Sequence, residues 1–104
     1  MKVGPVEVDG RELARVCAKW NVRELALFGS ATRDDFDEDS DIDLLVAFDP
    51  AVRFKMLKMA EIRADFGAVF GRRVDVVERA AVEENPNWVV RRAILESAQR
   101  LDVA

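Results

Sequence analysis

The sequence of 104 residues contains no histidine, no tyrosine and only one cysteine, Cys17. Without histidine, the chain cannot form a Ser-His-Asp triad, a Cys-His pair or a histidine-ligated zinc site. A single cysteine can form neither an internal disulfide nor a thiolate metal site. Any chemistry must therefore use carboxylates, hydroxyls, lysine, arginine or a bound metal ion.

Long apolar runs are also missing from the chain. No window approaches the roughly 18 apolar residues that a membrane helix needs, and the first ten residues show no targeting pattern. The chain has no paired cysteines that would demand an oxidising compartment. We therefore expect a cytoplasmic protein without membrane contact.

The composition bounds the class of protein. Hydrophobic residues make up 50% of the chain and charged residues 35%, which is typical of a globular protein rather than a disordered one. The length predicts a single domain over residues 1–104. Because 20 acidic residues outnumber 16 basic ones, the net charge is -4, and we expect no direct nucleic-acid binding.

Hydrophobic periodicity predicts alternating helices and strands. Helices are expected over residues 10–20, about 52–66 and about 87–101, and strands over residues 25–28, 42–48 and 74–77. A polar loop over residues 31–40 joins the first two strands, and Gly67 and Gly71 are expected to bracket a turn. This order predicts an α/β or α+β fold in which helices cover a sheet.

Asp41 and Asp43 form the first candidate site for chemistry. Alternate residues of a strand share a face, so these two carboxylates point the same way while Ile42 points into the core. Two neighbouring carboxylates repel each other unless a cation lies between them. Their oxygen atoms suit a hard divalent ion such as Mg²⁺, which keeps several waters and often binds phosphate oxygens as well.

Gly29 and Ser30 supply a second part of the site. Glycine after a strand lets the backbone approach a ligand closely. A turn that opens a short helix there would offer N–H groups to an anion. The Ser30 hydroxyl adds a donor for phosphate, and Arg33 can neutralise more of its charge. A magnesium–nucleoside triphosphate would satisfy both parts of this site.

Asp75 lies on the third predicted strand. If that strand neighbours the one over residues 42–48, Asp75 lies beside Asp41 and Asp43. Three carboxylates can hold two metal ions about 3.5–4 Å apart, an arrangement that clamps the attacking and leaving oxygens of a phosphoryl displacement. The three aspartates are therefore candidate metal ligands.

Several nearby residues have simpler interpretations. Asp35 begins an alternating acidic run, but Ser40 and Val46 stand where a calcium loop needs glycine and glutamate. The remaining candidates are read as a solvated loop (Asp37, Glu38, Asp39), solvated surface charges (Arg72, Arg73, Arg91, Arg92) and core residues (Cys17, Trp20, Trp88).

The run Gly29-Ser30, ten further residues and Asp41-Ile42-Asp43 resembles the signature of the DNA polymerase β-like nucleotidyltransferase superfamily. The small size of the chain is similar to that of the minimal nucleotidyltransferases, the antitoxin partners of HEPN-domain toxins. The resemblance covers residues 10–101. It implies the polymerase β-like fold, a small mixed β-sheet covered by helices.

The resemblance also implies how nucleotide would bind. Gly29 and Ser30 would hold the triphosphate of ATP, with Arg33 and Ser40 as further cofactor-binding candidates. The sequence departs from the family at Asp34-Asp35, where a glycine commonly follows the basic residue.

The activity implied by the resemblance is Mg²⁺-dependent transfer of AMP from ATP to a tyrosine hydroxyl of a HEPN-type toxin, with release of pyrophosphate. Asp41 and Asp43 would bind two metal ions, and Asp75 would be the third carboxylate and the base. Because the chain contains little beyond such a catalytic core, we expect a protein acceptor. Two alternatives stay open: an antitoxin that acts by occlusion only, and a small-molecule nucleotidyltransferase of the aminoglycoside type.

Overall fold

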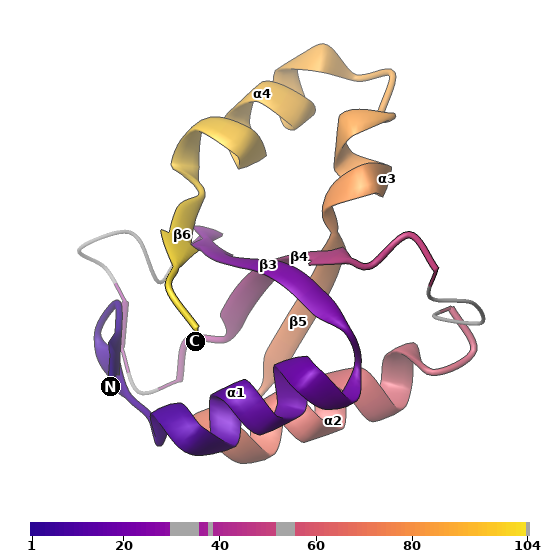
Figure 1. Cartoon of the computed structure of the whole chain (residues 1–104). Helices are drawn as coiled ribbons and strands as arrows, with labels where there is room; N and C mark the ends of the chain where they lie inside the picture. The colour runs from indigo at the N-terminus through magenta and orange to yellow at the C-terminus, as the bar shows by residue number, and fades with distance from the viewer. Residues whose placement is uncertain (30–35, 38, 52–55, 104) are drawn as a thin grey trace.

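The computed structural model describes residues 1–29, 36–37, 39–51 and 56–103. At its centre lies a four-stranded mixed sheet in the order β5-β4-β3-β6 (Figure 1). Its strands are β3 (Val22–Phe28), β4 (Ile42–Phe48), β5 (Val74–Glu78) and β6 (Gln99–Leu101). β3 is antiparallel to both β4 and β6, whereas β4 and β5 are parallel. The predicted fold, a small mixed sheet covered by helices, is confirmed.

Two helices, α1 (Gly10–Lys19) and α2 (Met59–Phe70), lie together against one face of this sheet (Figure 1). The side chain of Asp9 caps α1 by accepting hydrogen bonds from the N–H groups of Arg11 and Glu12. The main core lies between these helices and the sheet. Its most deeply buried side chains are Val3, Leu13, Val16, Leu27, Ile42, Leu44, Val46, Ile62 and Phe66.

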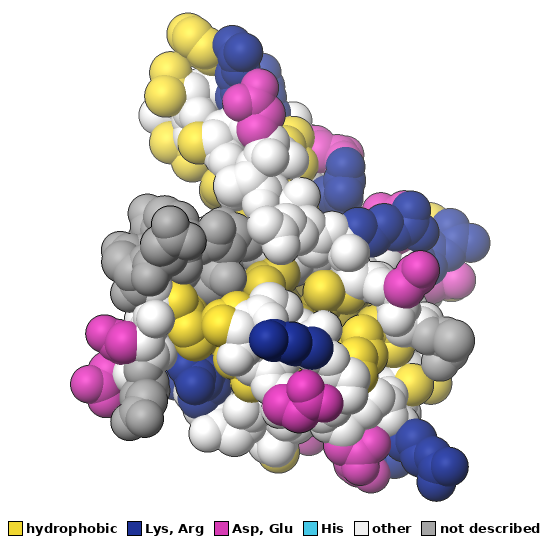
Figure 2. Space-filling view, turned by 90° about the vertical axis from the view of Figure 1, so that its left-hand side faces the viewer, with side chains coloured by type: hydrophobic (Ala, Val, Ile, Leu, Met, Phe, Trp, Pro, Cys, Tyr) yellow, Lys and Arg dark blue, Asp and Glu magenta, His cyan; other side chains and the backbone are white. Residues whose placement is uncertain are grey.

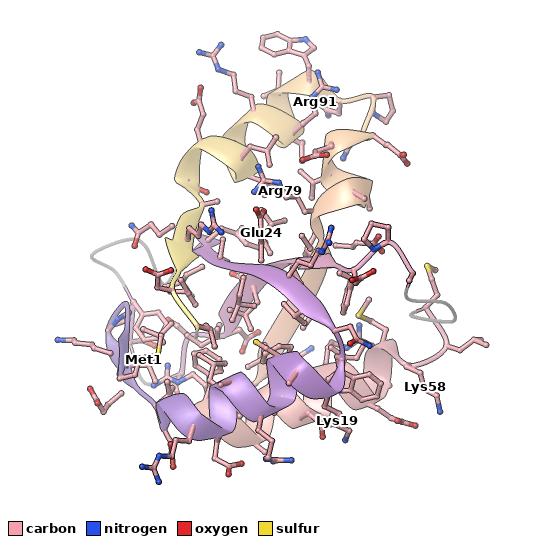
Figure 3. The ribbon with its side chains drawn as sticks, in the orientation of Figure 1. Met1, Lys19, Glu24, Lys58, Arg79 and Arg91 are labelled. Carbon is pink, nitrogen blue, oxygen red and sulfur yellow. The ribbon has the colours of Figure 1, made fainter. Side chains whose placement is uncertain are left out.

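The opposite face of the sheet carries α3 (Arg79–Glu83) and α4 (Trp88–Ser97). Only a small second cluster forms here among the described residues, centred on Ala26, Leu45 and Val82. Glu24 of β3 points toward this side, within 3.8 Å of Arg79 Nη1 and 3.9 Å of Arg100 Nη2 (Figure 3). This layer is therefore thinner and more polar than the main core.

The interpretation of Trp88 as a core residue is wrong, because its exposed fraction is 60%. It begins α4, whose described residues include none that is buried, and Val89 and Val90 are exposed beside it. Apolar side chains accordingly gather on the projecting end of the molecule formed by α3 and α4 (Figure 2). Trp20 and Cys17, by contrast, do pack against the main core.

The second predicted helix is wrong at both ends. The helix α2 begins at Met59 rather than near residue 52, and residues 52–55 lie outside the described part of the chain. Gly67 does not start a turn, because the helix continues to the buried Phe70. The helix ends only at Gly71, whose left-handed conformation (φ 66°) is the usual way to stop a helix. Burial of Phe70 outweighs the weak helix propensity of one glycine.

The last predicted helix extends too far. The helix α4 ends at Ser97, and residues 99–101 instead form β6, in which Leu101 pairs with Leu25 of β3. The sequence also did not predict the short helix α3 or the hairpin formed by β1 (Lys2–Val3) and β2 (Val6–Glu7). The strand β3 begins three residues earlier than expected. None of the described helices is long and apolar enough to cross a membrane.

Candidate active site

Sheet register brings two of the three candidate aspartates side by side. Asp43 of β4 lies between Phe28 of β3 and Asp75 of β5. Asp41 directly precedes β4, and Ile42 between the two aspartates is fully buried, as the alternation of strand residues predicted. The parallel pairing of β4 with β5 is therefore what places carboxylates from separate parts of the sequence at one end of the sheet.

These three aspartates line one open pocket of about 580 Å³. Its other walls come from α2 and from the turn that leads into β5. They consist of three arginines and three small or apolar residues: Arg63, Arg72, Arg73, Ala64, Gly67 and Val74. The pocket thus combines acidic oxygens with guanidinium groups, a charge pattern suited to a polyanion that carries cations.

Gly29 fixes the position of the Asp43 carboxylate. Gly29 ends β3 with φ 71°, and a Cβ built there would lie 2.5 Å from Asp43 Oδ2. The sequence predicted that this glycine permits close approach of a ligand to the backbone. In the structure, the close approach already involves a side chain of the protein itself. Any residue other than glycine would have to displace the carboxylate.

Asp37 and Ser40 build the turn that precedes Asp41. The N–H of Asp37 donates to Ser40 Oγ (3.1 Å), Ser40 Oγ donates to Asp37 Oδ1 (3.2 Å), and the N–H of Asp39 also donates to Asp37 Oδ1 (2.9 Å). Asp37 and Asp39 are exposed, as the interpretation of a solvated loop predicted, and Asp37 in addition accepts the hydrogen bonds that shape the turn. The Ser40 hydroxyl, a candidate for nucleotide binding, is engaged in this turn.

Arg72 is not the solvated surface charge that the sequence indicated. Its Nη1 donates to the carbonyl oxygens of Asp37 (3.1 Å) and Ser40 (3.0 Å). Its guanidinium also lies 4.7 Å from the centroid of the Phe36 ring. Arg73, next to it, is exposed as predicted, and its Nε lies 3.8 Å from Asp41 Oδ2.

Arg63 is a pocket residue that sequence reasoning did not assign to the site. It interrupts the apolar pattern expected for the second helix, and that interruption was the available signal. In the structure its side chain is exposed and contributes to the pocket wall from α2. Five other positions singled out from sequence lie outside the described residues: Ser30, Arg33, Asp34, Asp35 and Glu38.

The carboxylates of the pocket have the oxygen donors that a magnesium ion prefers. Within the described residues, no three carboxylate, thiol or imidazole side chains already converge as a metal site. Mg²⁺ does not need such a cage, since it usually takes one or two carboxylates together with waters and substrate phosphates. Asp41, Asp43 and Asp75 offer oxygen donors to one pocket with room for phosphate. These residues fit an ion that binds together with a nucleotide.

Comparison with known proteins decides the family. The family model for the nucleotidyltransferase domain matches residues 11–101. The chain belongs to this family. This nucleotidyltransferase is 34% identical over 77 residues to protein adenylyltransferase MntA of Thermococcus cleftensis, a match that covers 74% of this chain and 76% of that protein.

Solved structures agree with the fold of the nucleotidyltransferase. One, provisionally described as a minimal nucleotidyltransferase, has a TM-score of 0.66 and 30% identity, and the match covers 88% of both chains. Another, described as a toxin–antitoxin with AMP-PNP, has a TM-score of 0.66 and 15% identity, covering 93% of this chain and 75% of that one. The second likeness concerns the fold alone.

Proposed function

We propose that this nucleotidyltransferase transfers AMP from ATP to a tyrosine hydroxyl of a HEPN-type toxin and so acts as its antitoxin. The observation that carries the proposal is the pairing of Asp43 with Asp75 in a pocket that Asp41 also lines. The name of the relative MntA supports a protein acceptor. The description of a structural neighbour as a toxin–antitoxin supports a toxin partner. We place the reaction in the cytoplasm, where ATP is available.

In the proposed reaction, the tyrosine oxygen attacks the α-phosphorus of ATP, and the bond between that phosphorus and the oxygen bridging to the β-phosphate breaks. AMP becomes esterified to the tyrosine, and pyrophosphate leaves. Asp75 is exposed and lines the pocket, so its carboxylate is available to accept the hydroxyl proton. Asp41 and Asp43 would hold Mg²⁺, with Asp75 completing the set for a second ion. Bound Mg²⁺ would supply positive charge against the negative charge that develops on the phosphoryl oxygens.

The remaining pocket residues would bind the nucleotide. Arg63 and Arg73 place positive charge opposite the carboxylates, which favours a triphosphate over a neutral substrate. Gly29, Ser30 and Arg33 would hold the triphosphate, a proposal that the Gly29-Ser30 motif of the sequence supports. Ser40 would contribute through the turn that it forms rather than through a free hydroxyl.

A labelling experiment tests the proposed reaction. The nucleotidyltransferase is incubated with Mg²⁺, a HEPN protein encoded beside its gene, and ATP labelled on either the α- or the γ-phosphate. We expect the α-label on a tyrosine of the HEPN protein and no transfer of the γ-label. Asn substitution of Asp41, Asp43 or Asp75 should abolish labelling. Glu96→Gln is the matched control, because Glu96 lies on α4 and pairs with Arg92 away from the pocket.

The same experiment separates the alternatives. If the toxin is neutralised without being labelled, and the three Asn variants neutralise it equally well, the protein is an antitoxin that acts by occlusion. Label on an aminoglycoside but never on protein would show a small-molecule nucleotidyltransferase. Transfer of the γ-label would contradict nucleotidyl transfer altogether.

A further inference from the structure

Arg72 joins two segments of the active site that are far apart in the sequence. It follows Gly71 at the end of α2 and lies two residues before β5, the strand that carries Asp75. Its side chain contacts Phe36, Asp37 and Ser40, and Ser40 directly precedes Asp41. Both ends of this contact therefore border residues with proposed catalytic roles.

The contact consists of three interactions with one guanidinium group. Nη1 donates to the carbonyl oxygens of Asp37 and Ser40, which lie at the two ends of the hydrogen-bonded turn. The guanidinium carbon also lies over the ring of Phe36, within the range of a cation–π contact. One side chain thus connects the end of α2 to two carbonyl groups and one aromatic ring.

The backbone on the other side of Asp41 is also fixed to the same segment. The N–H of Ile42 donates to the carbonyl oxygen of Arg73 at 3.0 Å. Asp41 is thus flanked by Ser40, which is bound to the Arg72 side chain, and by Ile42, which is bound to the Arg73 backbone. Removing the Arg72 side chain would release one of these two anchors and leave the other in place.

We propose that Arg72 is a positioning residue that holds Asp41 in register with Asp75. This inference rests on the proposed function, because it concerns the same pocket. The guanidinium acts through the backbone carbonyl groups of Asp37 and Ser40 and not on the reacting atoms. Its loss should leave the fold and most of the ATP contacts intact but let the Asp41 carboxylate move relative to its neighbours.

The first test needs neither metal nor substrate. In the protein without added Mg²⁺ or ATP, the amide hydrogens of Asp39 and Ser40 are bound within the turn. Arg72→Ala should speed hydrogen exchange at these amides at least about tenfold, with amides of α1 unchanged. Val82→Ala, which loosens the cluster beneath α3, is the control for a general loss of stability and should leave the turn unaffected.

The second test is kinetic and uses ATP, Mg²⁺ and the HEPN acceptor well below the melting temperature of every variant. For Arg72→Ala we expect kcat to fall about 10–100-fold and half-maximal activity to need several-fold more Mg²⁺, with the KM for ATP within about twofold of wild type. Arg72→Lys should recover part of the loss, because it restores a positively charged donor, although as a compact charge on a flexible stem.

Three results would overturn the inference. If Arg72→Ala and Val82→Ala have the same hydrogen exchange rates and the same kinetic constants, Arg72 only stabilises the fold in general. A raised KM for ATP with unchanged kcat would make it a direct nucleotide ligand. Slow exchange at Asp39 and Ser40 in Arg72→Ala would show that the turn holds without it. If wild type transfers no AMP, the proposed function fails, and the exchange test still decides whether Arg72 fixes the turn.

Discussion

The backbone of Gly29 lies directly against the carboxylate of Asp43, so that a Cβ on Gly29 would approach Asp43 Oδ2 to 2.5 Å. Register explains this proximity, because Phe28 of β3 pairs with Asp43 of the antiparallel strand β4. The glycine at the end of one strand and the aspartate near the start of the next are therefore neighbours. The residues between Gly29 and Asp43 in the sequence are those that connect the two paired strands β3 and β4.

Replacing Gly29 with alanine should damage both stability and activity. The left-handed φ of 71° costs an L-residue about 1–2 kcal/mol, and the added methyl group must push the Asp43 carboxylate away. We expect AMP transfer to fall about 100-fold, because displacements near 1 Å have effects of that size. Chemical denaturation and the labelling assay measure the two effects separately.

Gly71→Ala is the matched control for this substitution. Gly71 has a similar φ of 66°, but a Cβ there meets nothing within 4 Å. It should therefore lose a similar free energy of unfolding while AMP transfer stays near that of wild type. Equal activity in the two variants would mean that the contact between Gly29 and Asp43 has no role in the reaction.

Magnesium and ATP together should stabilise the folded protein. A ligand present at about 100 times its Kd adds about 2.7 kcal/mol, which corresponds to a rise in Tm of about 10–20 °C for a domain of this size. EDTA should remove most of the rise, and Asp43→Asn should not show it. An identical rise in wild type and Asp43→Asn would place the nucleotide elsewhere.

Asp65 should make stability depend on pH in the acid range. Its Oδ2 accepts hydrogen bonds from Lys19 Nζ and Trp20 Nε1, both at 2.8 Å, which lower the pKa of Asp65. Because the pKa of Asp65 is lower in the folded state than in the unfolded chain, the ionised carboxylate stabilises the fold at pH values above the unfolded pKa of about 3.9. This stability is lost as the pH falls through the folded pKa. Asp65→Asn should cost about 1 kcal/mol at pH 7, discounted for the partial exposure of the site, and less below about pH 4.

Urea denaturation of both proteins between pH 3 and 7 measures this difference. Glu61→Gln is the control on the same helix, since its contact with Lys58 is 3.6 Å long and both side chains are more than half exposed. It should change stability by less than about 0.5 kcal/mol at any pH. A gap between wild type and Asp65→Asn that does not shrink in acid would contradict the role assigned to Asp65.

Cys17 should be unreactive in the folded protein. Burial raises the pKa of its thiol to about 11, so almost no thiolate exists at pH 8. Alkylation by iodoacetamide should proceed at the rate of unfolding events and become fast in urea. Because the folded state keeps its proton longer than the unfolded chain, stability should also fall between about pH 8.5 and 11. Rapid alkylation under native conditions would contradict the burial of the Cys17 side chain between α1 and the rest of the core.

The sequence predicts most of the site because the relevant rules are local. Alternation along a strand places Asp41 and Asp43 around the buried Ile42. The acidic cap at Asp9 and the spacing of apolar residues likewise suffice to predict α1. In each case the information lies within a few residues of the feature.

The features that the sequence does not predict depend on contacts between distant segments. The three residues of β6 have no pattern of their own and become a strand because Leu25 of β3 offers a pairing edge. Gly67 has the signature of a turn, but the burial of Phe70 keeps the helix intact. Arg72 has the sequence pattern of a surface charge, and only the fold brings the carbonyl groups of Asp37 and Ser40 beside it.

The most direct test of the account is the intact mass of the HEPN protein after incubation with ATP, Mg²⁺ and the nucleotidyltransferase. With wild type, we predict a mass increase equal to one or more AMP units, located on tyrosine by fragmentation. With Asp43→Asn, which keeps the size of the side chain beside Gly29, we predict an unchanged mass. An unmodified HEPN protein with wild type, or equal modification with Asp43→Asn, would contradict the central claim.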